Sequence, residues 1–147
     1  MRDIRLKNYI KYLYFGALIF HSLNKFLLRP WVLKNDFPGF AKVFVLSVPN
    51  FLEAVVGIIN ISILLVLLKW RSFKFLKKIP DIRLYTVALF LSSTYVITQE
   101  LKIHNLGGRN VYDPNDLIAS VIGLTGVFTL IAAYGVLEYS LSQKTAS

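Results

Sequence analysis

Charged side chains occur in this chain at places where long apolar runs begin or end. Two arginines and four carboxylic acids are the candidates for a ligand-binding site: Arg29, Glu53, Glu100, Arg109, Asp113 and Asp116. An arginine binds phosphate or carboxylate groups through paired hydrogen bonds. A neighbouring carboxylate can orient the arginine, accept a hydrogen bond from the ligand, or exchange a proton. These residue types therefore predict either anion binding or acid–base chemistry.

Motifs of well-known enzyme classes do not accompany these residues. The chain has no cysteine, and its two histidines, His21 and His104, fall in different segments without the spacing of a metal site. The sequence contains no nucleophile elbow, zinc-protease motif, P-loop or dinucleotide-binding glycine pattern. We therefore expect no metal and no cofactor, and we favour binding over catalysis. The alternative is a membrane-embedded enzyme that uses Glu53 or Asp116 as a general base on a lipid-linked substrate.

The amino-acid composition indicates which class of protein positions these side chains. Of the 147 residues, 55% are hydrophobic and 17% are charged. A soluble domain typically has about 45–50% apolar residues and about 25% charged residues. A domain of this size buries only about 70% of its surface, so a soluble single domain is excluded, and so is a disordered tail. The net charge of +9 does not indicate nucleic-acid binding, because no recognition motif accompanies it.

Four apolar runs predict membrane-spanning helices at about 9–28, 47–68, 84–101 and 115–137. The expected fold is all-α: one integral membrane domain over residues 1–147, arranged as a four-helix bundle. Pro49 has no amide hydrogen, so we expect it in the first turn of the second helix or at a kink where that helix begins. A short helix or irregular piece is expected around residues 35–42.

The basic residues predict the orientation of the bundle. With four spans, both termini and the middle loop lie on one side, which carries 11 of the 17 Lys and Arg residues. The positive-inside rule then places both termini in the cytoplasm. The basic middle loop, residues 69–83, is expected on the inner membrane surface, and a solvated linker is the alternative.

The candidate residues all fall near the predicted outer ends of the four spans, which suggests one polar pocket open to the outer face. Each acid also has a simpler interpretation. Asp113 suits the N-cap of the last helix, with Pro114 at its first position, and Asp116 faces the positive end of that helix. Glu100 can be solvated at the interface. Glu53 lies about one turn inside its span and can pair with Arg29, and an acid at such a depth is a candidate site residue by default.

The stretch from Gln99 to Gly126 resembles the VanZ-like membrane proteins. That family has an acid late in the third span, an Arg in the next loop, two spaced Asp residues, and then a small or polar residue and a glycine. In this chain those places are taken by Glu100, Arg109, Asp113, Asp116, Ser120 and Gly123. The chain departs from the family in having Ser120 where Asn is common and Gln99 before the acid rather than after it, and the second family glycine falls one residue beyond Gly126. The resemblance covers about a fifth of the chain and implies a bacterial plasma-membrane protein, linked in some cases to glycopeptide resistance or envelope functions.

The function we expect is that of a small, non-catalytic protein of the bacterial plasma membrane. Its outward-facing pocket would bind an anionic lipid headgroup or a cell-wall lipid intermediate. A third possibility is an accessory subunit of a larger membrane complex that docks through the small residues Gly123, Gly126 and Ala133.

Overall fold

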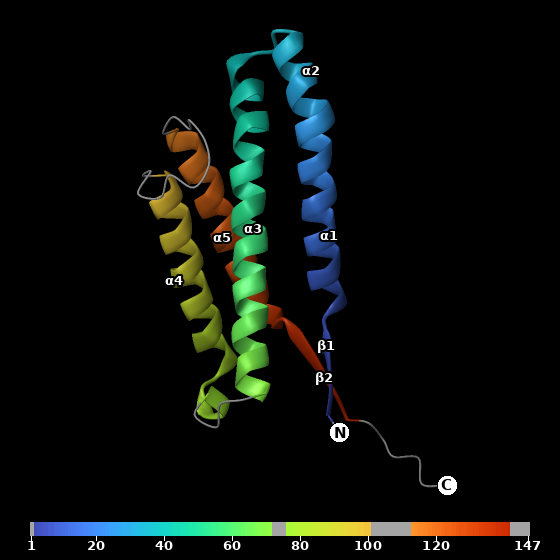
Figure 1. Cartoon of the computed structure of the whole chain (residues 1–147), viewed down its shortest axis with the longest axis vertical. Coiled ribbons are helices and arrows are strands. Elements are labelled where there is room, and N and C mark those ends of the chain that lie inside the picture. The colour runs from blue at the N-terminus through green and yellow to red at the C-terminus, as the bar shows by residue number, and fades with distance from the viewer. Residues whose placement is uncertain (1, 72–75, 101–112, 142–147) are drawn as a thin grey trace, which may run out of the picture.

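The computed structural model describes residues 2–71, 76–100 and 113–141. This part of the chain is mostly helical, and its long helices lie side by side in an elongated bundle (Figure 1). The elements in chain order are β1 Arg2–Leu6, α1 Asn8–Leu23, the π-helix η1 Asn24–Leu28, α2 Arg29–Lys34, α3 Gly39–Arg71, the 3₁₀ helix η2 Leu76–Lys78, α4 Asp81–Glu100, α5 Pro114–Tyr134 and β2 Leu137–Leu141. We call the two ends of the bundle the α2 end and the ribbon end, the latter being where β1 and β2 lie.

The first predicted span is longer than expected, because α1, η1 and α2 form one continuous helical column from Asn8 to Lys34. The backbone at both junctions, Asn24 and Arg29, is right-handed helical. Pro30 in the first turn of α2 cannot donate to the carbonyl four residues before it. The column passes through this position with one π-helical turn, in which the amide of Arg29 donates to the carbonyl of Asn24.

Helix α3 has 33 residues and absorbs part of the segment expected to be separate, since it begins at Gly39. The expected position of Pro49 was wrong: it lies inside α3 rather than in its first turn. A proline at this position leaves the carbonyl of Val45, four residues earlier, without its helical donor. The side-chain amide of Asn24 donates to that carbonyl at 2.9 Å instead, and Asn24 is completely buried. The polar residue of one helix therefore compensates for the proline of another.

Helix α3 is the centre of the bundle and contacts α1, α4 and α5. It runs antiparallel to α1 and α4 and parallel to α5, which lies behind it in Figure 1. Helices α3 and α5 lie close together at Gly123, where an added Cβ would lie 2.7 Å from the backbone oxygen of Phe51. Gly123 therefore packs inside the chain and is not free to dock another protein. Gly126 is exposed and has open space beside it.

The expectation of an all-α fold was incomplete, because β1 and β2 form an antiparallel two-stranded ribbon with Arg5 opposite Glu138 and Leu6 opposite Leu137. The last helix ends at Tyr134 rather than near residue 137. Gly135 follows with φ of +70°, a backbone conformation that favours glycine. Its carbonyl accepts a hydrogen bond from the hydroxyl of Tyr9 at 2.6 Å. The ribbon thus joins the start of α1 to the end of α5.

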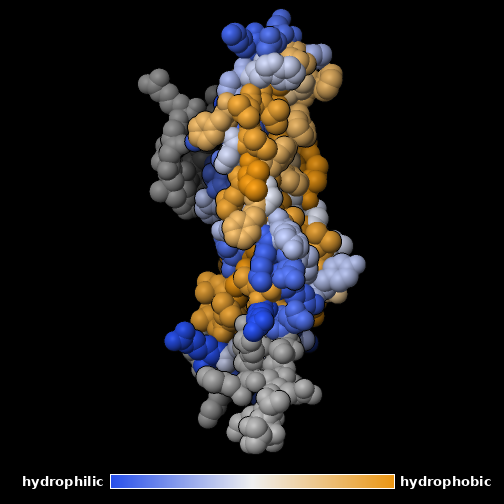
Figure 2. Space-filling view, turned by 90° about the vertical axis from the view of Figure 1, so that its right-hand side faces the viewer, coloured by the Kyte–Doolittle hydropathy of each residue, from blue (hydrophilic) through white to orange (hydrophobic). Residues whose placement is uncertain are grey.

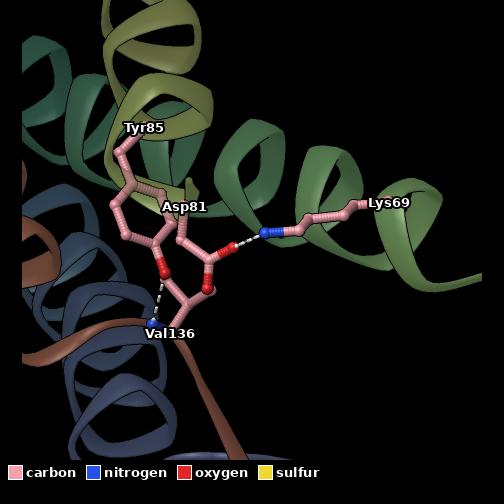
Figure 3. A network of polar contacts seen from close by, with 4 residues as sticks. All are labelled: Lys69, Asp81, Tyr85 and Val136. Atoms are coloured by element: carbon pink, nitrogen blue, oxygen red, sulfur yellow. Dashed lines mark hydrogen bonds and ion pairs between the residues drawn. The ribbon is translucent and has the colours of Figure 1, made fainter. Parts of the chain in front are cut away.

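Polar contacts also join α3, α4 and Val136, the residue before β2, at the ribbon end (Figure 3). The ammonium group of Lys69 lies 2.5 Å from a carboxylate oxygen of Asp81. The hydroxyl of Tyr85, one turn further along α4, accepts a hydrogen bond from the amide of Val136 at 3.2 Å. The loop between α3 and α4 is therefore held at both sides of residues 72–75, which lie outside the described part of the chain.

Two of the described helices, α3 and α5, are long and apolar enough to cross a membrane. Large apolar side chains are also exposed on α1 and α4, among them Phe15, Ile19, Phe90 and Leu91. Figure 2, which views the molecule from the α1 side, shows a mainly hydrophobic band below a hydrophilic cap at the α2 end. The surface therefore has the hydrophobic character that a membrane environment requires.

Candidate functional site

Glu53 lies on a face of α3 that no other described helix covers. Its carboxylate accepts a hydrogen bond at 3.1 Å from the hydroxyl of Tyr95 on α4, and both side chains are exposed. Gly57 and Asn60 follow Glu53 at the i+4 and i+7 positions and therefore share its face. We call these three residues the Glu53 stripe. Asn60 is exposed and lines a small groove of about 210 Å³ between α1 and α3, so the stripe runs along α3 between α1 and α4.

Arg29 does not meet Glu53, contrary to the expected pairing. Since Asn24 is hydrogen-bonded to the carbonyl of Val45, Arg29, five residues further along the column, lies near position 40 of α3. Glu53 is 13 residues further along α3, which is about 20 Å at 1.5 Å per residue. No ion pair joins the two within the described ranges. Their separation arises because the first helical column extends beyond the expected end of the span.

Asp113 is the N-cap of α5, as one of the two sequence interpretations proposed. Its carboxylate accepts hydrogen bonds from the backbone amide of Asn115 at 2.9 Å and from the side-chain amide of the same residue at 2.8 Å. Pro114 occupies the first helical position, where a missing amide hydrogen has no cost. Asp113 therefore has a structural role that accounts for its position.

Asp116 differs from Asp113, because its Oδ1 atom is buried without a hydrogen-bond partner among the described residues. The hydroxyl of Ser120 donates to the backbone oxygen of Asn50 at 3.3 Å, which aligns α5 with α3. One turn earlier, Asp116 lies level with positions 46–47 of α3, about 10 Å along the helix axis from Glu53. Asp116 and Glu53 are therefore not a carboxylate pair.

The remaining two predicted site residues cannot be placed in this geometry. Arg109 lies outside the described residues, and so does the side chain of Glu100, the last residue of α4. Among the described residues no group of three His, Asp or Glu side chains is placed to hold a metal ion. The described candidates are therefore spread along the bundle at three levels: Arg29, Asp116 with Asp113, and Glu53.

A feature that the sequence interpretation missed lies on the opposite side of α3. Two adjoining grooves of about 460 and 560 Å³ lie among α1, α3 and α5 and share Phe20, Phe51 and Ile122 in their linings. We call them together the α1–α5 groove. Its lining on α5 extends from Asn115 to Leu130, which is about 22 Å at 1.5 Å per residue. The groove has the length of a lipid chain and opens to the side of the bundle.

The lining of the α1–α5 groove is mainly apolar, with Tyr12 toward the ribbon end and a polar mouth of Ser47 and Asn115 near the α2 end. There the hydroxyl of Ser47, only 7% exposed, has no hydrogen-bond partner among the described residues. Asn115 lines the same part of the groove. A buried hydroxyl without a partner costs free energy, and a ligand or water molecule that bonds to it removes that cost. The sequence signal for this site is a serine inside an apolar run, with glycines at 16 and 126 that leave space beside the flanking helices.

Basic side chains surround the α2 end. Lys25, Arg29 and Lys34 form no ion pair in the described part of the chain, whereas Lys42 pairs with Asp36 at 2.5 Å. The hydrogen bond from Lys42, together with its charge, lowers the pKa of the Asp36 carboxyl. Asp36 lies in the exposed turn between α2 and α3, and Lys42 lies in the first turn of α3. Among the described residues, this end of the bundle has a small excess of positive charge: four basic side chains, Lys25, Arg29, Lys34 and Lys42, against three acids, Asp36, Asp113 and Asp116.

Comparisons with known proteins identify no relative. No protein-family model matches the chain, and neither the curated proteins nor the solved structures include a significant match. The VanZ-like resemblance of residues 99–126 stays a prediction.

Proposed function

We propose that this protein is a non-catalytic, multi-pass protein of the bacterial plasma membrane that binds an anionic lipid or a lipid-linked envelope precursor. The observation that carries the proposal is the α1–α5 groove, which joins an apolar channel to a polar mouth. A ligand of this shape is an amphiphile, because the groove is lined by apolar side chains for most of its length. Its chain lies between α1 and α5, and its headgroup lies at the α2 end.

The charge at the α2 end favours a phosphate-bearing headgroup. Lys25, Arg29 and Lys34 are exposed there without an ion pair in the described ranges. Arginine binds phosphate with two parallel hydrogen bonds, and lysine contributes a mobile point charge. The hydroxyl of Ser47 adds a donor and acceptor for a neighbouring ester or hydroxyl group.

Insertion with four spans and both termini in the cytoplasm is part of the same proposal. The exposed apolar surfaces of α3 and α5 suit the hydrocarbon core. The pairing of β1 with β2 brings the first and last described elements to the same end of the bundle, as an even number of spans requires. That end carries the larger share of Lys and Arg residues, so the positive-inside rule makes it cytoplasmic.

The test compares lipid retained by the full chain purified in a mild detergent. Ile122 lines both parts of the α1–α5 groove and is 57% exposed. Ile122→Trp fills the groove, and we expect it to lower the phospholipid that copurifies by about fivefold, as measured by mass spectrometry of the extracted lipid. Val121→Trp is the matched control, because Val121 is exposed on α5 and lines neither part of the groove.

A double variant tests whether the ligand has an anionic headgroup. Arg29→Gln combined with Lys25→Gln removes two cations at the α2 end, and we expect a lower ratio of anionic to zwitterionic lipid in the extract. Equal amounts and equal compositions in wild type, Ile122→Trp and the double glutamine variant would refute the proposal.

A further inference from the structure

Lipid binding in the α1–α5 groove does not explain the Glu53 stripe. The stripe is a hydrophilic face of α3 at the depth of the hydrocarbon core of the proposed membrane. Glu53 and Asn60 are exposed in the middle part of α3, the most apolar helix that can cross a membrane. A carboxylate facing hydrocarbon costs several kcal/mol on most scales, so such side chains usually meet a partner. The hydroxyl of Tyr95 provides one hydrogen bond and leaves the charge of Glu53 without a counter-ion in the described part of the chain.

A cation of this chain lies on the same side of the molecule at a similar depth. Lys11 of α1 lines the small groove that Asn60 also lines, and its exposed ammonium group bonds only to Asn8, at 3.4 Å, among the described residues. From the contact of Asn24 with Val45, Lys11 lies level with position 58 of α3. It is therefore about 8 Å along the helix axis from Glu53, a difference that the flexible lysine side chain can cover.

Lys11 and Glu53 of one chain lie on opposite flanks of the stripe. Lys11 belongs to α1, whereas the carboxylate of Glu53 is bonded to α4. Helix α3 separates α1 from α4 in the view of Figure 1. A two-fold axis that runs along the membrane normal and passes next to the stripe exchanges the two flanks while keeping every residue at its depth. The α1 of one copy then faces the α4 of the other.

We propose that the Glu53 stripe is the interface of a symmetric homodimer, in which Lys11 of each copy pairs with Glu53 of the other. The charges are self-complementary, since one face supplies both an acid and a base at neighbouring depths. Gly57, at the centre of the stripe, has nothing within 4 Å of an added Cβ, so the two α3 helices can approach closely there. In the dimer, the polar groups of the stripe are surrounded by two ion pairs and the amide of Asn60 instead of hydrocarbon. The inference uses the membrane insertion of α3 proposed above and is independent of lipid in the groove.

The absence of cysteine from the chain makes cross-linking a direct test. In the proposed dimer, the Gly57→Cys thiol of one copy lies next to the same thiol of the other copy across the two-fold axis. Mild oxidation of the full chain in liposomes should therefore give a covalent dimer. Gly126→Cys is the matched control: it also replaces a glycine with open space around it, at the same depth of the bundle but on the α1–α5 groove. We expect at least about a fivefold higher dimer yield for Gly57→Cys. Equal yields from the two variants, or no dimer from Gly57→Cys, would overturn the proposal.

Charge exchange tests which residues pair. Lys11→Glu and Glu53→Lys each place like charges opposite one another, and each should raise the dissociation constant of the dimer in bilayers at least about tenfold, equivalent to about 1.4 kcal/mol. The double variant Lys11→Glu with Glu53→Lys restores both pairs and should recover the wild-type constant. Recovery would exclude general misfolding as the cause of the single-variant losses. Failure of the double variant to recover, or a wild-type chain that stays monomeric at every protein-to-lipid ratio, would contradict the pairing. Lipid retention by the same variants reports separately on the α1–α5 groove.

Discussion

Helices α5 and α1 pack against the same central helix, α3, in different ways. Helix α5 lies so close to α3 that an added Cβ at Gly123 would meet the backbone of Phe51. Helix α1 also packs on α3, through the buried side chains of Ile10 and Ala17, but it has grooves on both sides. Its polar attachments are at specific points: Asn24 on Val45 near the α2 end, and Tyr9 on Gly135 at the ribbon end. Helix α5 therefore packs more closely on α3, whereas α1 combines a narrower packed contact with hydrogen bonds near its two ends.

The two ends of the bundle show a related difference. At the ribbon end Lys69 and Asp81 are largely buried, with side chains 12% and 32% exposed, while at the α2 end Lys42 and Asp36 are 35% and 94% exposed. The two ion pairs have the same N–O distance of 2.5 Å. Their contributions to the free energy of unfolding must differ, because water and salt screen an exposed pair. The ribbon end thus has the more buried ion pair, and the α2 end has the more exposed one.

The largest effect is expected from filling the tight contact between α5 and α3 at Gly123. Gly123→Leu forces α5 away from α3, because the new side chain would overlap the backbone oxygen of Phe51. We expect a destabilisation of at least about 3 kcal/mol, or a failure to accumulate folded protein. Gly126→Leu, three residues further on, meets open space and should change the melting temperature in detergent little. Similar melting temperatures for the two variants would contradict the close packing of α5.

The next effect concerns the hydrogen bond that joins Asn24, at the end of α1, to α3 near the α2 end. Asn24→Leu leaves the buried carbonyl of Val45 without a donor, because Pro49 has no amide hydrogen to offer. We expect a loss of about 1–3 kcal/mol in the free energy of unfolding. Pro49→Ala restores the helical donor, so the double variant should recover part of this loss. If Pro49→Ala does not reduce the cost of Asn24→Leu in a double-mutant cycle of denaturation midpoints, the compensation is wrong.

A smaller effect distinguishes two tyrosine hydroxyls on α4. Tyr85→Phe removes the acceptor for the buried amide of Val136 and should cost about 1–2 kcal/mol. Tyr95→Phe removes an exposed hydrogen bond to Glu53 and should cost less than about 0.5 kcal/mol, because an exposed group can bond to water instead. Thermal unfolding of the two variants side by side measures the difference, and a larger cost for Tyr95→Phe would reverse the comparison.

The smallest effect is expected at the exposed pair. Lys42 lowers the pKa of Asp36 in the folded chain, so the pair stabilises the fold above the pKa that Asp36 has when unfolded. This stabilisation is lost as the pH falls through the lowered folded value. Lys42→Met should therefore change the melting temperature slightly at pH 7 and not at all below about pH 2. Lys69→Met should lower the melting temperature more at pH 7, because Lys69 and Asp81 are more buried. Equal changes in melting temperature for the two lysine variants at pH 7 would show that burial does not make the Lys69–Asp81 pair more stabilising than the Lys42–Asp36 pair.

Several local features could be predicted from the sequence. Asp113 and Pro114 predicted the start of α5, because an N-cap and a proline at the first helical position satisfy orphan groups locally. The apolar runs predicted the helices. The shared face of Glu53, Gly57 and Asn60 follows from their spacing, since helical periodicity alone fixes it.

Other features depended on residues far apart in the sequence. The ribbon pairs residues 2–6 with residues 137–141. The second segment alternates apolar and polar residues, as a strand does, but its partner lies at the other end of the sequence and no local pattern identifies it. The role of Asn24 depends on Pro49 in another helix. Arg29 and Glu53 were expected to meet because both lie near predicted span ends, yet the continuation of the first column to Lys34 separates them.

The sequence by itself determined the hydrophobic helices, the cap of α5 and the positions of the charged groups along each helix. These properties depend on the chemistry of residues within one or two turns. Only the tertiary structure decided which side chains face each other, because that depends on the rotation and axial shift of each helix against α3. The contact of Gly123 with Phe51 sets this relation for α5, and the hydrogen bond of Asn24 to Val45 sets it for α1. Together they place an apolar groove on one side of α3 and the Glu53 stripe on the other.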